Sequence, residues 1–387
     1  MSELSRRIFM KGCCMAAVVY GASSRVAQAQ TPNTPDAIVD QNHIRQATQD
    51  GTPIYGTVAD ALASAPDNSV TPWTIALMPG HYSEKLTITK PNICLVGSGR
   101  GETCIAFDAF AGAEKPDGTG QWGTPGSATL TINAPDFKAY HLTIANDFDF
   151  LDNDRRDPHG ANRIGASQAV AIYLGNGADR SLFYDVAMTG YQDTVFADRG
   201  RSLFSHCIIS GNVDFIFGGG AALFDHCDIV SRPRAVPTTL PAGFVSAPST
   251  AKDSPFGLIF RYCDLKKENA DQPAGSHYLG RPWHPTRDFK DGRYADPDAI
   301  GQAVFFHCHM EDHIATDGWT SMSGLAKDGQ RKWFQPLVDA RFLEYKSTGP
   351  GANINASRPQ LSNAEALTYS PEHILGDWKP QLEHFNL

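Results

Sequence analysis

The chain has 387 residues, of which 41% are hydrophobic and 19% charged, and its formal net charge is −9. This apolar content excludes a disordered chain, and the acidic balance argues against a nucleic-acid partner held by phosphate contacts. The 35 glycines and 25 prolines, with few charged helix formers, argue against a helical bundle. The length suffices for one large, repetitive all-β domain.

The first 29 residues predict an export signal. The sequence S-R-R-I-F-M-K at 5–11 precedes an apolar stretch, and A-Q-A at 27–29 has the pattern of a cleavage site. The paired arginines followed by Phe9 resemble a twin-arginine signal. An ordinary secretory signal is the alternative, and a membrane anchor is disfavoured because the apolar run is short. We therefore predict a secreted protein, extracellular or periplasmic, that is not held by a membrane.

Removal of residues 1–29 would take away four basic residues and one acidic residue. The net charge would then change from −9 to −12.

A repeated strand pattern dominates the rest of the chain. A short helix is first predicted at 58–65, with Thr57 as its N-cap, to cover the N-terminal end of the repeats. Strands of alternating polarity are predicted around 86–88, 93–96, 129–132 and 141–144.

Three copies of one pattern then follow at offsets of 21 and 20 residues, at 182–188, 203–209 and 223–229. The Phe-x-x-Cys spacing of these copies returns at 260–263 and 305–308. Each copy alternates with period two, as a half-buried strand does. A period near 20 residues is too short for an αβ unit and suits one coil of a right-handed parallel β-helix. We predict this all-β fold, with a short N-terminal capping helix, as a single domain over residues 30–387.

Two kinds of side chain could link or bind across the repeats. Cys207 and Cys227 fall at equivalent positions of adjacent coils, so a disulfide between them is predicted, with two stacked thiols as the alternative. His307, His309 and His313 look like metal ligands, but only the first two would share a strand face. Surface histidines on a loop are the preferred interpretation, and we expect no metal.

The strongest candidate chemistry is a pair of acids. The sequence contains no G-x-S-x-G, H-E-x-x-H or Walker motif. Asp193 and Asp214, however, are 21 residues apart, which is one coil of the predicted solenoid. Stacking would bring the two carboxyl groups together near Tyr191 and Phe217, where like charges in a partly apolar setting raise one pKa and leave the other group ionised. Arg281 could hold the ionised member, whereas either aspartate alone would more simply cap a turn.

Five ordered motifs resemble the pectin methylesterase (pectinesterase) family over essentially all of the mature chain. They are M-P-G-H-Y-S-E at 78–84, Q-A-V-A at 168–171, G-Y-Q-D-T at 190–194, V-D-F-I-F-G at 213–218 and L-G-R-P-W at 279–283. The segment 279–299 and the ending L-G-D-W at 375–378 look most like the secreted enzymes of plant-pathogenic bacteria. The family fold is a right-handed parallel β-helix, in agreement with the repeats.

The resemblance implies a catalytic role for each matching residue. Asp214 would be the nucleophile that attacks a methylated galacturonate, and Asp193 the acid and base. Gln192 and Gln168 would donate hydrogen bonds to the oxyanion, and Arg281 would orient Asp214. The residues expected to contact the polysaccharide are Thr124, Tyr191, Phe217, Arg234, Trp283, Thr286 and Met322. The products would be pectate and methanol, with no cofactor, and the solenoid would act as a monomer.

Three departures from the family pattern bear on subsite preference. Asn212 stands where many members have Thr, residues 218–220 are three consecutive glycines, and the loop 234–243 contains no Asn. The triple glycine is expected to give the backbone beside the nucleophile more freedom.

Three rival functions remain open. A pectin depolymerase would need acids for calcium or carboxylates spaced across a glycosidic bond; some family relatives act on other acyl esters; and a non-catalytic β-helix could bind carbohydrate through Tyr191, Phe217 and Trp283. The intact set of acids and amides favours the methylesterase. Because an acidic enzyme repels polygalacturonate at long range, a preference for highly methylated stretches is expected.

Overall fold

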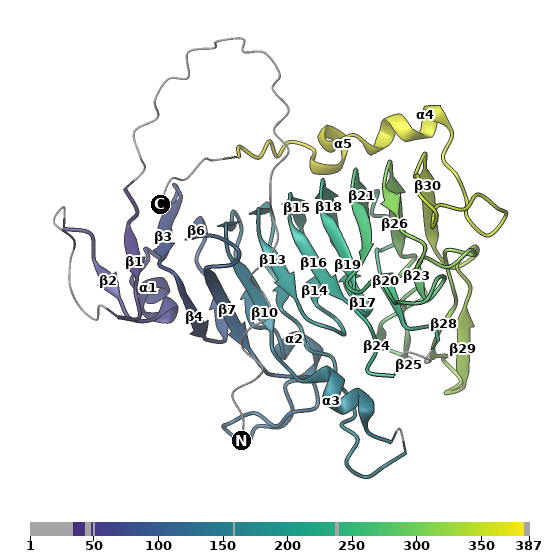
Figure 1. Cartoon of the computed structure of the whole chain (residues 1–387), viewed down its shortest axis with the longest axis horizontal. Coiled ribbons are helices and arrows are strands. Elements are labelled where there is room, and N and C mark those ends of the chain that lie inside the picture. Colours follow the sequence, from purple (N-terminus) through teal and green to yellow (C-terminus); the bar gives the residue numbers. More distant parts are fainter. Residues whose placement is uncertain (1–33, 43–47, 49–50, 158, 237–239, 383–387) are drawn as a thin grey trace. The chain divides into compact units, whose positions relative to one another are not determined.

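Successive coils of the chain stack on one another, and their strands form three parallel sheets that make up the body of the protein (Figure 1). The computed structural model describes residues 34–42, 48, 51–157, 159–236 and 240–382. The predicted export signal lies outside these residues. Successive coils contribute neighbouring strands to each sheet, so the predicted right-handed parallel β-helix is confirmed.

The first and longest sheet has 11 strands. In spatial order they are β2 (Ile54–Tyr55), β1 (Ala37–Val39), β3 (Trp73–Leu77), β6 (Ile93–Gly97), β9 (Lys138–Tyr140), β12 (Ser181–Tyr184), β15 (Arg201–Ser205), β18 (Ala221–Asp225), β21 (Leu258–Arg261), β26 (Gln302–Phe306) and β30 (Arg341–Tyr345).

The other two large sheets have eight and seven strands. The 8-stranded sheet contains β27 (His309–Met310), β22 (Asp264–Lys267), β19 (Asp228–Ser231), β16 (Ile208–Gly211), β13 (Ala187–Thr189), β10 (Thr143–Asn146), β7 (Thr103–Phe107) and β4 (Gly80–Ser83). The 7-stranded sheet contains β23 (His277–Gly280), β20 (Gly243–Pro248), β17 (Val213–Gly218), β14 (Val195–Ala197), β11 (Ile172–Leu174), β8 (Leu130–Ile132) and β5 (Leu86–Ile88).

Two antiparallel hairpins and a few short helices complete the described structure. The hairpins are β24 (Thr286–Phe289) with β25 (Gly292–Ala295) and β28 (Met322–Leu325) with β29 (Arg331–Phe334). The helices are α1 (Val58–Ser64), α2 (Gly123–Gly126), α3 (Phe150–Arg155), α4 (Asn363–Ala366), the 3₁₀ turn η1 (Leu367–Tyr369) and α5 (Pro371–Leu375).

Helix α1 confirms the predicted N-terminal helix, with Ala65 as its C-cap. The Thr57 hydroxyl accepts a hydrogen bond from the Asp60 amide (3.1 Å). The carboxylate of Glu84 accepts from the amides of Val58 (2.8 Å) and Ala59 (2.9 Å). These bonds satisfy N–H groups that a helix start leaves free, and the helix packs Val58 and Ala61 into the core.

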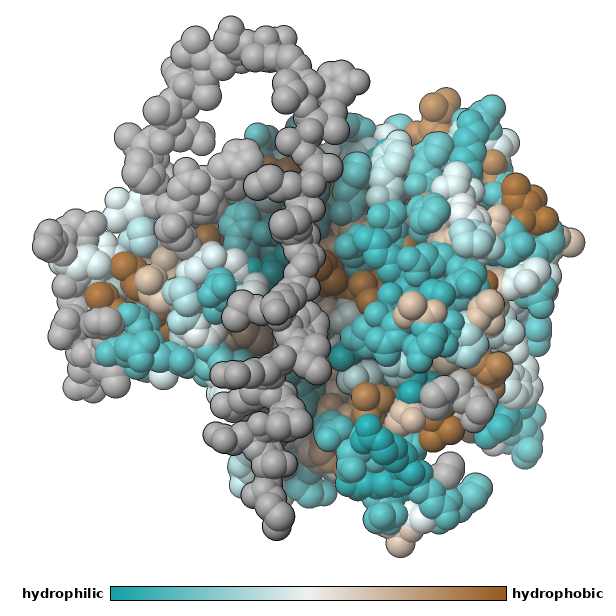
Figure 2. Space-filling model, viewed as in Figure 1, coloured by the Kyte–Doolittle hydropathy of each residue, from teal (hydrophilic) through white to brown (hydrophobic). Residues whose placement is uncertain are grey.

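The core consists of side chains that repeat from coil to coil. A column of phenylalanines has neighbouring ring centroids 4.4–5.7 Å apart, namely Phe137, Phe183, Phe204, Phe224, Phe260 and Phe305. By contrast, on the face seen in Figure 2 hydrophilic residues predominate and hydrophobic ones form small separate patches.

The repeated pattern is two strands joined by a corner, rather than the single strand that period-two alternation predicted. At each corner one residue has a left-handed backbone with φ between +51° and +55°, and these residues are Asp185, His206, His226, Tyr262 and His307. We call this set the histidine corner. The bend turns both the Phe before it and the Cys after it into the core, which explains the Phe-x-x-Cys spacing.

The predicted disulfide between Cys207 and Cys227 is wrong. Cys207 and Cys227 are both free thiols. Cys207, Cys227, Cys263 and Cys308 form one column in which each Sγ donates a hydrogen bond of 3.3–3.5 Å to a Phe carbonyl of the preceding coil. Each thiol therefore has a backbone carbonyl as its acceptor, and the four positions stack as thiols without a disulfide.

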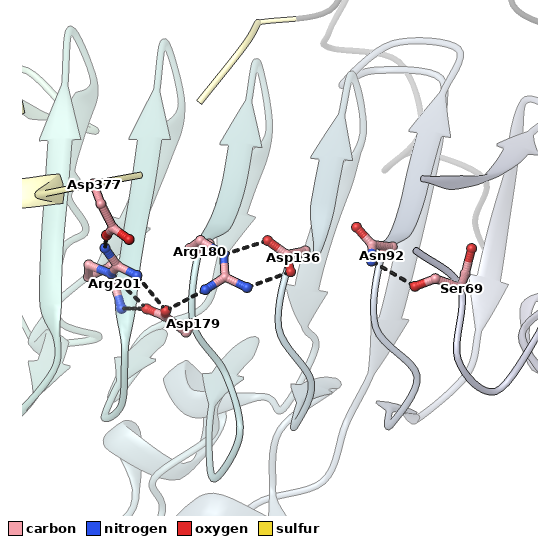
Figure 3. Close-up of polar contacts among 7 residues, drawn as sticks. All are labelled: Ser69, Asn92, Asp136, Asp179, Arg180, Arg201 and Asp377. Atoms are coloured by element: carbon pink, nitrogen blue, oxygen red, sulfur yellow. Dashed lines mark hydrogen bonds and ion pairs between the residues drawn. The ribbon is translucent and has the colours of Figure 1, made fainter. Parts of the chain in front are cut away.

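A ladder of ion pairs links neighbouring coils at a different corner of the β-helix and binds the C-terminal segment there (Figure 3). Arg180 donates two hydrogen bonds of 2.6 Å to Asp136, and Arg201 donates to Asp179 (2.7 Å). Arg201 also binds the Leu375 carbonyl (2.9 Å) and the Asp377 carboxylate. The ladder therefore fastens the end of α5 to the strands of three neighbouring coils.

Candidate active site

Asp193 and Asp214 lie at neighbouring strands of the 7-stranded sheet, as their spacing predicted. Asp193 stands two residues before β14, and Asp214 is the second residue of β17. The Asp193 amide donates to the Val213 carbonyl (3.0 Å), so the segment before β14 is bonded directly to the start of β17.

Both aspartates have a left-handed backbone, with φ of +67° for Asp193 and +50° for Asp214. At Asp214 the register against β20 also shifts between Val213 and Ile216, which marks a β-bulge. Bulges redirect a side chain, and strained non-glycine residues concentrate at functional sites. The bulge thus turns one carboxylate out of the regular in-and-out alternation of its strand.

Arg281 binds Asp214 through two parallel hydrogen bonds. Its Nε lies 2.8 Å from Oδ1 and its Nη2 2.6 Å from Oδ2. The Arg281 guanidinium also lies 3.9 Å from the centre of the Phe244 ring. Bidentate pairs of this kind add geometric specificity as well as energy, so the Asp214 carboxyl group is held in one orientation beside a guanidinium charge.

Among the residues that the structure describes, no cation forms an ion pair with Asp193. Only 7% of the residue is exposed, and burial together with the neighbouring charge of Asp214 raises its pKa well above the ordinary value, although Arg281 opposes this. The protonated form of Asp193 is therefore favoured where Asp214 is ionised, which places an acid beside a carboxylate.

Two amides border the acids. Gln192 directly precedes Asp193, and its Oε1 accepts a hydrogen bond from the Ser167 hydroxyl (3.2 Å), which leaves its NH₂ group as a donor. Gln168 lies in the neighbouring loop, because the Ala169 amide donates to the Gln192 carbonyl (3.2 Å). Sequence reasoning missed Ser167, whose only signal is its position beside Gln168.

Backbone bonds continue from this loop to Thr124. The Ala111 amide donates to the Gln168 carbonyl (2.8 Å), and the Gly123 amide donates to the Ala111 carbonyl (2.8 Å). Thr124 follows Gly123 in α2 and is partly exposed.

An aromatic cluster occupies the outer face of the same sheet. Phe217 stacks on Phe196 (4.2 Å between centroids), which stacks on Tyr173 (4.8 Å). The half-buried Trp283 meets Phe217 edge-on at 5.6 Å. Phe217 and Trp283 were predicted from the sequence, whereas Phe196 and Tyr173 were missed because their alternation with inward residues looks like any strand.

The triple glycine has a different role from the predicted freedom. Gly218 has φ of +124°, and a Cβ there would lie 2.2 Å from the Ala197 carbonyl oxygen. Close approach of two coils therefore requires glycine at the end of β17. Asn212 is fully buried, and its side-chain amide has no hydrogen-bond partner among the described residues.

Tyr191 and Arg234 both contact helix α3. Tyr191 stacks on Phe150 of α3 (5.3 Å), with the Arg232 guanidinium 3.9 Å from the centre of its ring. Arg234 binds the buried Asp154 through two nitrogens. Burial favours a higher pKa for Asp154, but the hydrogen bonds and charge of Arg234 outweigh it and lower that pKa. Helix α3 was not predicted.

Thr286 and Met322 lie on the two hairpins rather than on the sheet. Thr286 begins β24 and Met322 begins β28. Met322 pairs with Phe334, whose ring stacks at 3.7 Å on His284, the residue after Trp283. Packing of this kind attaches the second hairpin to the Trp283 segment.

His313 is not the surface histidine that the sequence predicted. His309 is exposed, but His313 is fully buried and its ring lies 5.6 Å from that of the buried His277. Within the described part of the chain, no three His, Cys, Asp or Glu side chains are grouped to hold a metal ion. No helix there is long and apolar enough to span a membrane.

Comparison with known proteins agrees with this geometry. The family model for pectinesterase matches residues 45–375. The chain belongs to the pectinesterase family. It is 46% identical to pectinesterase A of Dickeya chrysanthemi over 374 residues, which cover 96% of this chain and 99% of that protein.

Solved structures of pectin methylesterases share the fold. One in complex with a hexasaccharide superposes with a TM-score of 0.85 at 47% identity, over 91% of this chain and 100% of the other. The enzyme from Yersinia enterocolitica gives 0.80 at 45% identity, over 84% and 99%. The predicted family is thus confirmed, and with it the enzyme class.

Proposed function

We propose that this pectinesterase removes methyl groups from methyl-esterified galacturonate units of pectin through an acyl-enzyme on Asp214. The observation that carries the proposal is the unequal pair of acids. Asp214 is bound at 2.8 and 2.6 Å by Arg281, and burial beside it raises the pKa of Asp193. One residue type therefore supplies both a nucleophile and an acid.

In the first half-reaction an oxygen of Asp214 attacks the ester carbonyl carbon at C6. The NH₂ groups of Gln192 and Gln168 donate hydrogen bonds to the oxyanion that forms. The bond from C6 to the methoxy oxygen then breaks, and Asp193 gives its proton to that oxygen. Methanol leaves, and C6 remains joined to Asp214 as an anhydride.

In the second half-reaction Asp193 acts as a base. Its carboxylate takes a proton from a water molecule whose oxygen attacks C6. The anhydride bond to Asp214 breaks, which restores the Asp214 carboxylate and leaves Asp193 protonated. The galacturonic acid product then loses its proton to the solvent.

Polymer binding is assigned to the outer face of the 7-stranded sheet and its borders. The exposed part of Trp283 beside Phe217 offers an apolar surface for a sugar ring. Thr124, Tyr191, Arg234, Thr286 and Met322 are assigned to the borders of the same surface. The preference for highly methylated stretches remains a prediction from net charge.

Export is proposed from the sequence alone. The twin-arginine-like segment at 5–11 and the cleavage pattern at 27–29 assign residues 1–29 to a signal and the catalytic domain to residues 30–387. The mature enzyme would act outside the inner membrane as a monomer.

The proposal is tested by measuring methanol release and chain length together on methylated pectin. We expect methanol without shortening of the polymer. Shortening without methanol would instead support a depolymerase, and binding with neither change would support a carbohydrate-binding protein. Release of acetate from acetylated pectin without methanol would indicate an esterase for another acyl group.

A further inference from the structure

Lys85 is a cation at the end of the active-site sheet. It directly precedes β5, the terminal strand of the 7-stranded sheet. Its neighbour Glu84 is directed to the amides of Val58 and Ala59 in α1. Among the described residues, no acidic side chain forms an ion pair with Lys85.

The strand register places Lys85 at the same edge of the sheet as the catalytic acids. Leu86, Leu130, Ile172 and Val195 are equivalent residues of β5, β8, β11 and β14. Lys85 therefore aligns with Thr194, the residue that follows Asp193. Three strand spacings of about 4.8 Å separate the two, or roughly 14 Å along the stack of coils.

The surroundings of the ammonium group leave it only partly satisfied. Nζ donates one hydrogen bond to the Ala128 carbonyl (2.6 Å) and lies 4.8 Å from the centre of the Trp122 ring. Lys115 approaches the same ring at 6.0 Å. Two N–H groups of Lys85 remain for a ligand, and burial lowers its pKa to about 8.

A predicted substrate contact adjoins this group. The hollow of about 270 Å³ that Lys85 also lines, between β5 and helix α1, is bordered by neither Trp122 nor Ala128. Trp122 is two residues before Thr124, which the family resemblance assigns to substrate. A polymer that crosses the acids and runs along the stack of coils would reach Lys85 roughly 14 Å from Thr194.

We propose that Lys85, over Trp122, binds the free carboxylate of a demethylated galacturonate unit at this end of the groove. The inference rests on the proposed function, since it takes the polymer to lie across Asp193 and Asp214. An ammonium group that lacks a counter-ion gains most from a carboxylate, and the Trp122 face suits a sugar ring. The two ends of the groove then differ: Lys85 holds product units, and the aromatic end near Trp283 holds methylated ones.

The test is binding of unmethylated hexagalacturonate to the full-length enzyme by titration calorimetry at pH 6. Lys85→Met keeps an unbranched side chain of similar length and removes the charge. We expect its dissociation constant to rise by more than about tenfold, in line with one hydrogen bond to a charged group. Lys252→Met, which removes an exposed, distant charge paired with Asp298, is expected to change it less than twofold.

A second measurement uses the lowered pKa of Lys85. Between pH 6 and pH 9 the wild-type affinity is expected to fall as Lys85 loses its proton, whereas Lys85→Met loses most of this pH dependence. Equal affinities of wild type and Lys85→Met, or an equal loss in Lys252→Met, would overturn the proposal. Melting temperatures verify that the variants are folded, and a wild type that releases no methanol would refute the proposed function separately.

Discussion

The histidine corner and the catalytic edge of the 7-stranded sheet share a left-handed backbone conformation but place their aspartates in different environments. Asp185 at the histidine corner and Asp193 and Asp214 at the catalytic edge all have φ between +50° and +67°. Asp185 is partly exposed and bound by Arg100 (3.1 Å) and His141 (2.7 Å). Asp193 and Asp214 are each only 7% exposed, and only Asp214 is paired with a cation. The repeat determines where a carboxylate stands, and burial and cation pairing determine what chemistry it can perform.

The largest expected effect separates these aspartates by mutation. Asp214→Ala removes the proposed nucleophile, and loss of such a residue costs on the order of 10⁴-fold or more in rate. We expect methanol release to fall by at least that factor while binding to pectin persists. Asp185→Ala, the matched change at the histidine corner, should keep more than half of the activity. Near-normal methanol release by Asp214→Ala would show that the nucleophile is wrongly assigned.

The next effect sharpens the role of the amide beside the acids. Gln192→Ala removes one oxyanion donor and is expected to lower kcat about 10²- to 10³-fold with little change in KM. Gln330→Ala, at an exposed turn, should leave both constants unchanged. A rise in KM with kcat intact would assign Gln192 to substrate binding alone.

Two buried histidines, His277 and His313, are expected to make the stability of the protein depend on pH. Burial lowers the pKa of His277 to about 4 and of His313 to about 3. The unfolded chain binds protons at these groups below about pH 6.5, and the folded chain does so only near pH 4 and 3. As the pH is lowered from 6.5 to 4, the free energy of unfolding should therefore fall by up to about 1.4 kcal/mol per pH unit for each histidine.

Urea denaturation at several pH values measures this slope. His313→Asn should flatten it, and His309→Gln, which changes an exposed histidine, should not. A slope that is the same in all three proteins would show that the acid sensitivity comes from other groups.

The smallest expected effect concerns the thiols beside the histidine corner. Because Cys207 and Cys227 are free, a reducing agent should shift the melting temperature by less than about 1 °C. A disulfide closing a loop of this length would contribute about 3 kcal/mol and a shift of several degrees. Such a shift on reduction would show that the two cysteines are bonded in the mature protein.

Features that repeat along the chain were predictable from sequence, and features that depend on one local bend or a distant contact were not. The 21-residue offset placed Asp193 beside Asp214, and the Phe-x-x-Cys spacing identified the coils. The left-handed corner within each copy was missed because the residues there, such as His206 and Tyr262, carry no glycine signal. Helix α3 and the contact of Asp154 with Arg234 join segments 80 residues apart, and no local pattern indicates them.

The family resemblance supplied roles that the repeats alone could not. Stacking implied an unequal acid pair, but it did not decide which aspartate is the nucleophile. The structure separates them physically, since Arg281 pairs with Asp214 and burial acts on Asp193 without a dedicated cation.

Neutron diffraction from deuterium-exchanged crystals at pH 6 tests the central claim most directly, because it locates the deuterons on both carboxyl groups. The predicted result is a deuteron on Asp193 and none on Asp214, with Arg281 fully charged. A deuteron on Asp214, or two ionised aspartates, would contradict the division of labour between acid and nucleophile.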